Sequence, residues 1–279
     1  MAEPFGIAAG AVSVAAAFTA CVDCFGYVQL GRHFGRDFQT DLLALNCARL
    51  RLTRWGQAIN IYEDPKLGRP DANPADIQIA KDTLLQILVL FANTERISKK
   101  YRLNAKAGDD LSILGPYDMD PGVMAINNRM RELAIKRQKG SSILKTASWA
   151  LYHRSELKEL IASITCLIDN VETLFPAPQS QLALVREETA QIGDEQSLKL
   201  VESATQDVDS LLQSAAKEVL TGHQFLNVVA KGKAHIGDAF SSDWKLKAIT
   251  SHTYDGVEVD KDGKALIGNK FGGKDFWDD

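Results

Sequence analysis

Apolar side chains recur every three or four residues through most of residues 1–220, the spacing that gathers them on one face of an α-helix. Prolines and glycines interrupt the pattern, so several helices follow one another. Pro74 fits the first turn of the second helix. The pattern predicts an all-α bundle for residues 1–220. Its expected helices cover residues 37–61, 77–101, 123–139, 141–152, 155–175, 181–191 and 197–220.

The N-terminal segment carries no charged side chain from Pro4 to Val22. Its strongly apolar residues contribute roughly −2 to −3 kcal/mol to membrane insertion, and Asp23 opposes this by up to about 3 kcal/mol. Because the sum is near zero, residues 1–34 are interpreted as a conditional membrane segment. Gly6 and Gly10 have the spacing that permits close helix approach in lipid. The apolar residues of the segment are Phe5, Ile7, Val12, Val14, Phe18 and Val22.

The same segment also fits a buried helix at the centre of the bundle, because it is short and weakly apolar for a membrane span. Cys21 and Cys24 form a CxxC pair within it. A zinc site needs four ligands at matched spacing, and a redox motif needs a βαβ context. Neither is present, so buried thiols on a helix are expected.

The composition changes near residue 221, where a glycine-rich tail begins. Residues 221–279 hold 8 of the 20 glycines of the chain and only three leucines. The tail therefore predicts turns and short strands rather than long helices. We place a domain boundary at about residue 220.

The tail contains an internal repeat with a period of 31 residues, in copies of about 223–240 and 254–271. Neither copy can bury its apolar face alone, and stacked repeats usually need three or more units. Other copies of the chain can supply the missing neighbours, which predicts a cross-β filament. The identical pairs are Val228/Val259, Gly232/Gly263, Lys233/Lys264, Ala234/Ala265, Ile236/Ile267, Gly237/Gly268 and Phe240/Phe271.

In such a stack Lys231 would neighbour Asp262, and Asp238 would neighbour Asn269. These two contacts are favourable, whereas lysines facing each other from the two copies must stay solvated. A flexible tail or a small β-hairpin appendage remains the alternative to the filament.

Composition and motifs narrow the function class. The net charge of −4 disfavours a nucleic-acid binder, and four scattered cysteines do not form a disulfide scaffold, so a cytoplasmic location is expected. The chain lacks GxSxG, HExxH and GxGxxG motifs. The GxxxxGK at Gly268 lacks its Ser/Thr, and Asp260 begins an incomplete calcium loop. We therefore expect no catalytic residue, no metal and no cofactor.

The two ends of the chain together carry a family resemblance. The opening MAEPFGIAAGAVSVAAAFTACVDCFGYVQLGRHFGRDF resembles the HeLo domain of the fungal HET-s/HET-S heterokaryon-incompatibility proteins. KAHIGDAF and KALIGNKFGGKDFWDD resemble the two prion-motif repeats of the same family. The match runs the whole length, with a more diverged middle.

The resemblance implies an all-α HeLo bundle followed by a tail that is disordered when soluble and forms a β-solenoid amyloid with two rungs per chain. Gly237 and Gly268 are implied to lie in turns, followed by Asn269, while Phe271, Phe276 and Trp277 pack along the flank. The implied apolar core is made of Leu226, Val228, Ala234, Ile236, Val257, Val259, Ala265 and Ile267.

The resemblance also implies a membrane-toxic effector of programmed cell death. In the family, refolding of the tail onto an amyloid template destabilises the HeLo fold, and the N-terminal segment then inserts into the plasma membrane as part of a pore. The implied partners are further copies of the chain, in the amyloid and in a HeLo dimer, and membrane lipids. The template is a HET-s-type prion or an NLR-like receptor with a similar motif.

Two positions bear on the behaviour within the family. The toxic type carries His, and the prion type Pro, at the position matching His33, so His33 favours the toxic type. Asp23 matches the residue of the non-toxic prion type. The signature is mixed, so a toxic effector, a non-toxic prion that acts as template or inhibitor, and a helical interaction module with a flexible tail all stay open.

Overall fold

The computed structural model describes residues 12–32, 38–115, 118–139, 148–222, 224–240 and 252–271. Its contacts divide the chain into two units, Met1–Gln213 and Ser214–Asp279. The division falls inside the last helix, before the boundary expected at about residue 220, which stays a prediction. Each unit is described by itself.

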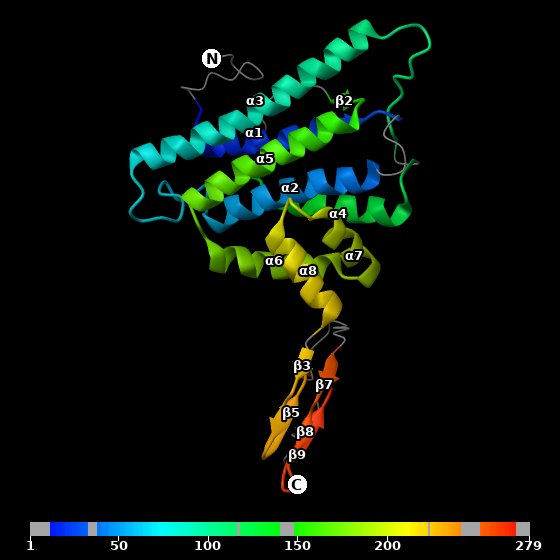
Figure 1. Ribbon diagram of the computed structural model, residues 1–279. Helices are drawn as coiled ribbons and strands as arrows, with labels where there is room; N and C mark the ends of the chain where they lie inside the picture. Colours follow the sequence, from blue (N-terminus) through cyan, green and yellow to red (C-terminus); the bar gives the residue numbers. More distant parts are fainter. Residues whose placement is uncertain are drawn as a thin grey trace. The chain divides into compact units, whose positions relative to one another are not determined.

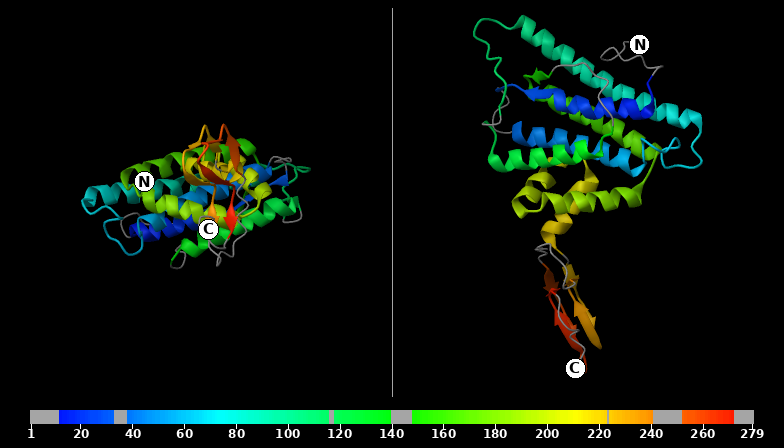
Figure 2. Two further views of the ribbon diagram at one scale, coloured as in Figure 1. Left: turned by 90° about the horizontal axis from the view of Figure 1, so that it is seen from below. Right: turned by 180° about the vertical axis from the view of Figure 1, so that it is seen from behind.

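The first unit is a helical bundle in which α2 is central (Figure 1 and Figure 2). This helix contacts α1 and α5 on one side, α6 and α7 on the other, and α4 alongside. The predicted all-α bundle is therefore confirmed. Its helices are α1 (Val14–Tyr27), α2 (Phe38–Ala58), α3 (Pro74–Asn104), α4 (Pro121–Arg137), α5 (Arg154–Leu174), α6 (Pro178–Ile192), α7 (Glu195–Ala204) and the start of α8 (Ser210–Thr221).

Side-chain caps explain where several helices begin. Asn73 precedes α3 and forms a capping box with Asp76, and Pro74 occupies the first turn, as predicted. Asp120 caps α4, and its carboxylate accepts from the amides of Gly122 and Val123. Ser13 caps α1. These capping side chains accept hydrogen bonds from amides that have no partner inside the helix.

Two predicted helices need correction, the one over residues 141–152, of which 141–147 lie outside the described residues, and the one over residues 197–220. Residues 149–151 form the strand β2 (Trp149–Leu151), which pairs in parallel with β1 (Val28–Leu30). All three β2 residues are buried, and so short an apolar run carries no helical or strand period. The helix predicted over 197–220 is two helices, because the chain turns between Thr205 and Asp209, with Asp207 at a positive φ of 60°.

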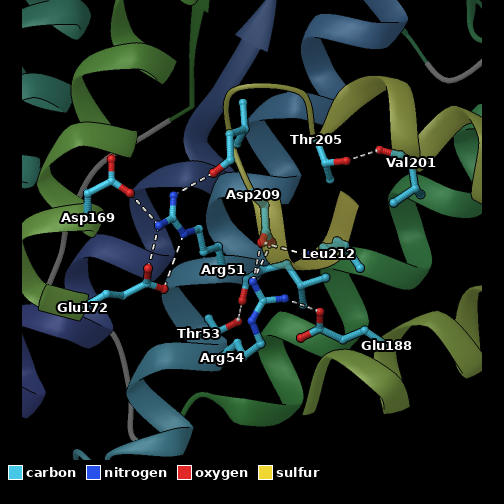
Figure 3. Close-up of polar contacts among 12 residues, drawn as sticks. Arg51, Thr53, Arg54, Asp169, Glu172, Glu188, Val201, Thr205, Asp209 and Leu212 are labelled. Atoms are coloured by element: carbon cyan, nitrogen blue, oxygen red, sulfur yellow. Dashed lines mark hydrogen bonds and ion pairs between the residues drawn. The ribbon is translucent and has the colours of Figure 1, made fainter. Parts of the chain in front are cut away.

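A buried arginine joins three parts of the bundle (Figure 3). Nη1 of Arg54 on α2 lies 2.6 Å from Oε2 of Glu188 on α6, and Nη2 lies 2.6 Å from both carboxylate oxygens of Asp209. Arg54 and Glu188 are 0% exposed. Burial alone would lower the pKa of Arg54, but the two carboxylates hold that pKa above its ordinary value. Arg54 therefore stays charged inside the core.

The carboxylate of Glu188 also pairs with Arg137 of α4. Burial raises the pKa of Glu188, while Arg54 and Arg137 oppose that rise. One turn earlier on α2, Arg51 donates to Glu172 of α5 at 2.5 Å. Arginines of α2 thus bind α5, α6 and the turn before α8.

The described residues of the second unit form the remainder of α8 and four pairs of parallel strands, each pairing the first repeat with the second. The pairs are β3 (Gln224–Leu226) with β7 (Thr253–Asp255), β4 (Val229–Ala230) with β8 (Glu258–Val259), β5 (Lys233–Ile236) with β9 (Lys264–Ile267), and β6 (Ala239–Phe240) with β10 (Lys270–Phe271). The short strands expected in this tail are therefore present.

The register of these pairs corrects the predicted alignment. Ile236 pairs with Ile267, 31 residues on, as the repeat implies. Ala230, however, pairs with Val259, which was expected beside Val228. Two residues join β4 to β5, whereas residues 260–263 join β8 to β9, so the second copy has the longer turn. Lys231 and Asp262 lie in these two turns, outside the paired strands, so their expected proximity stays a prediction.

We expect Arg54→Met to lower the free energy of unfolding by about 3–5 kcal/mol, because it removes the ion-pair partner of the buried Asp209 and leaves Glu188 with Arg137 alone. Urea unfolding of the full-length chain measures this change. Asp169→Asn is the matched control. It removes a charge from the pair with Arg51, but Asp169 is 55% exposed, so the expected loss is below about 1 kcal/mol. Equal losses in both variants would contradict the assignment.

Candidate functional site

Helix α1 is packed tightly against α2. Phe18 is fully buried and meets the rings of Trp55 and Tyr62 at centroid distances of 6.4 and 5.8 Å. A Cβ atom added at Gly56 would lie 2.4 Å from the Phe18 ring, so only glycine allows this approach. Thr19 adds a contact of 3.0 Å between its hydroxyl and that of Tyr62. The buried-helix interpretation of this part of the N-terminus is therefore confirmed.

The structure describes part of the predicted membrane segment. Val12 and Val14 are half-buried, while Phe18 is in the core. Among the described residues, none of the helices combines the length and the apolar character that a bilayer crossing requires. Membrane insertion stays a prediction. The remaining residues assigned to the segment, Phe5, Gly6, Ile7 and Gly10, lie outside the described residues.

Asp23 is the only charged residue of α1, and its charge acts on the guanidinium of Arg49. Its Oδ1 accepts a hydrogen bond of 2.7 Å from Gln138, beyond α4. Its other oxygen is buried and has no hydrogen-bond partner within the described ranges. Arg49 of α2 is 4% exposed, and its pKa falls to about 10 through burial and Arg131, with Asp23 opposing. His33, the other position singled out, lies outside the described residues.

The two cysteines of α1 lie in the core of the bundle. Cys21 and Cys24 are free and buried, as expected. Burial raises the pKa of both thiols, so they stay protonated at neutral pH. In the part of the chain that the structure describes, no cluster of three or more His, Cys, Asp or Glu is placed to hold a metal.

The residues assigned to the amyloid core differ in their burial within a single chain. Ile236 is 5% exposed, whereas Leu226 is 55% exposed. Val259 and Ile267 are also exposed, and Val228, Ala234, Val257 and Ala265 are half-buried. Two rungs leave apolar side chains uncovered, so their role in a longer stack stays a prediction. Phe276 and Trp277 lie outside the described residues, as does the side chain of Phe271.

Two glycines bring the repeats close together. Gly237 has a φ of 147°, and a Cβ atom there would lie 2.1 Å from the carbonyl oxygen of Gly268. Gly268 has a φ of 118°. Both conformations belong to the region that favours glycine. The next residues also meet, since the amide of Asp238 donates to Oδ1 of Asn269 at 3.2 Å.

Sequence reasoning missed an aromatic and histidine cluster between the repeats. The rings of Phe225 and Tyr254 stack with centroids 5.2 Å apart and an interplanar angle of 7°. Nε2 of His252 lies 3.3 Å from Asp238 Oδ2 and contacts Asn269. Phe225 and Tyr254 are 29 residues apart, and the 31-residue repeat does not align them.

Comparisons with known proteins agree with this two-part organisation. The family model described as HeLo, prion-inhibition and propagation, matches residues 6–201. "Heterokaryon incompatibility protein S" of Podospora anserina is 34% identical over 289 residues. "Heterokaryon incompatibility protein s" of Podospora anserina is 35% identical over 295 residues. Both alignments cover 100% of this chain and 100% of the relative.

Two solved structures resemble the helical unit. The HET-S N-terminal domain has a TM-score of 0.72 and 37% identity, covering 78% of this chain and 97% of that chain. A doubly substituted HET-s N-terminal domain has a TM-score of 0.69 and 36% identity, covering 74% and 97%. The resemblance drawn from the two ends of the sequence is thus confirmed. Because a HeLo family model spans most of the bundle and the relatives match from end to end, this chain belongs to the HeLo family of heterokaryon-incompatibility prion proteins.

Proposed function

We propose that this protein is a cell-death effector of heterokaryon incompatibility, which disrupts membranes after its tail is templated into amyloid. The observation that carries the proposal is the parallel pairing of the two repeats. Each tail sheet has two strands within the described ranges, so each strand keeps one edge directed away from its partner. Such edges are templates for further strands of the same register.

The proposed partners are molecules whose strands can pair with these strand edges. A further copy of the chain, a HET-s-type prion or an NLR-like receptor with a similar motif would present matching strands to the open edge. The protein would remain in the cytoplasm until templated and would then move to the plasma membrane, where lipids become its partners. No enzymatic step and no cofactor enters this proposal.

The membrane-active element would be α1 with the residues before it. Helix α1 carries only one charge, at Asp23, and is held by its packing against α2 and α3. Since the insertion balance of the segment is near zero, the membrane neither strongly favours nor strongly excludes it, and its packing in the bundle decides where it lies. Loss of the packing around Phe18 would then favour the membrane.

Asp23 supports a second candidate, the non-toxic prion type that carries this residue. Its carboxylate is bound by Gln138 and lies in the field of Arg49. These contacts connect α1 to α2 and to the residue that follows α4. In this candidate the tail still assembles, and the chain acts as template or inhibitor.

Dye release from anionic liposomes distinguishes the two candidates. We expect full-length protein to release dye only after addition of preformed fibrils of residues 221–279. Co-assembly with the fibrils, measured by sedimentation, serves as the internal control. Co-assembly without dye release would overturn the effector proposal and favour the prion candidate.

We expect Gly237→Ala to block seeded assembly, because its Cβ would clash with the Gly268 carbonyl and alanine rarely adopts this φ. Gly232→Ala is the matched control in the same repeat, since an added Cβ there meets nothing within 4 Å. Thioflavin fluorescence after seeding measures both variants. Equal assembly of the two would show that the stacked strands are not the templated form.

We expect His33→Pro to abolish seeded dye release while assembly continues. Proline restricts the backbone of the residue before it, and the amide of that residue, Arg32, donates to the carbonyl of Ser112 at 3.0 Å. Unchanged release in the same liposome assay would mean that position 33 does not decide toxicity in this chain.

A further inference from the structure

Asp209 is both the cap of α8 and the counter-ion of the core arginine. Its Oδ1 accepts from the amide of Leu212 at 3.1 Å, and its carbonyl accepts from that of Gln213 at 2.9 Å. The same carboxylate binds Arg54 through both oxygens (Figure 3). The first turn of α8 and the neutralisation of a buried charge therefore depend on one side chain.

The turn before α8 has a second anchor on the same helix. Nη1 of Arg51 donates to the carbonyl of Val208 at 2.8 Å. Arg51 and Arg54 are three residues apart and lie on one face of α2. The start of α8 is thus fixed to α2 by two arginines rather than by apolar contacts alone.

The opposite face of the same turn of α2 holds α1. Gly56 follows Arg54 by two residues, a spacing that points to nearly opposite sides of a helix. Gly56 provides the close approach for Phe18, and Trp55 between them donates from Nε1 to the carbonyl of Phe175 at 3.2 Å. This single turn of α2 therefore lies between the start of α8 and α1.

The chain connects α8 directly to the repeats. Helix α8 ends at Thr221 and β3 begins at Gln224. Unwinding of α8 from its C-terminal end would reach Asp209 within about three turns. A shift of Asp209 would leave the fully buried Arg54 with one carboxylate fewer, which is a strongly unfavourable state.

We propose that Asp209 and the Arg54–Gly56 turn of α2 form a coupling element that makes α1 loosen when α8 unwinds. This inference rests on the proposed function for its biological meaning, since it assigns the residues that regulate release of α1. Asp209 acts as a positioning residue: it keeps Arg54 neutralised, and Arg54 keeps Gly56 against Phe18. In physical terms, α1 and α8 would open together although they are distant in sequence.

Native-state hydrogen exchange of the full-length chain tests the coupling, without vesicles or fibrils. We expect Asp209→Asn to accelerate amide exchange in α1 and α8 together by about 100-fold, and in α3 by clearly less. Asp169→Asn, the exposed control on Arg51, should leave α1 within about threefold of the native chain. Equal acceleration of α1, α3 and α8 would overturn the proposal, because it would mark global destabilisation only.

A second variant disturbs α8 from the tail side and leaves Asp209 in place. Glu218 is exposed in the second half of α8, and Glu218→Pro removes a helical amide and clashes with the preceding turn. We expect it to accelerate exchange in α1 about tenfold or more, with Glu218→Ala as control. Added to Asp209→Asn, it should have little further effect on α1.

In the Glu218→Pro variant, faster exchange in α8 with unchanged exchange in α1 would refute the coupling. This test still applies if Asp209→Asn does not fold. Because neither membrane nor amyloid enters the measurement, its failure is distinguishable from failure of the proposed function. Loss of dye release in liposomes, with the two helices still opening together, would refute only the function.

Discussion

A charged guanidinium without access to water sets the conditions for the rest of this bundle. Arg54 is compatible with burial only while Glu188 and Asp209 stay in place, and these two come from α6 and from the turn before α8. An uncompensated charge in such a site is far more costly than a lost apolar contact. The ion network therefore ties the last helix to the middle of the fold, whereas an apolar core would tolerate a gradual loosening.

Under the proposed coupling, the same network would let the tail influence the bundle. The division between the two units falls within α8, which ends at Thr221, and β3 begins at Gln224. The tail has few buried side chains of its own, and its strands are two to four residues long. Added rungs would bury more of the apolar side chains of the tail and so stabilise it. Under the proposed coupling, this stabilisation would act on α8.

Much of the helical fold could be predicted from the sequence, because apolar periodicity and caps such as Asn73 and Asp120 are local. The strand at Trp149 escaped prediction since three buried apolar residues carry no period. The break at Asp207 depends on a positive φ that no residue type in this turn predicts. Arg54 finds partners 134 and 155 residues away, and no sequence pattern links them. Identity between the repeats located the tail strands but could not reveal the difference in turn length.

That difference gives an assembled stack a direction. Two residues join β4 to β5, whereas residues 260–263 join β8 to β9. Successive rungs therefore differ in the length of this turn. In a fibre made from copies of this chain, the true repeat would be two strand spacings, about 9.5 Å, rather than one. One end of the fibre would expose the first repeat and the other end the second. The two ends would then elongate at different rates, and a seed would be a polar object.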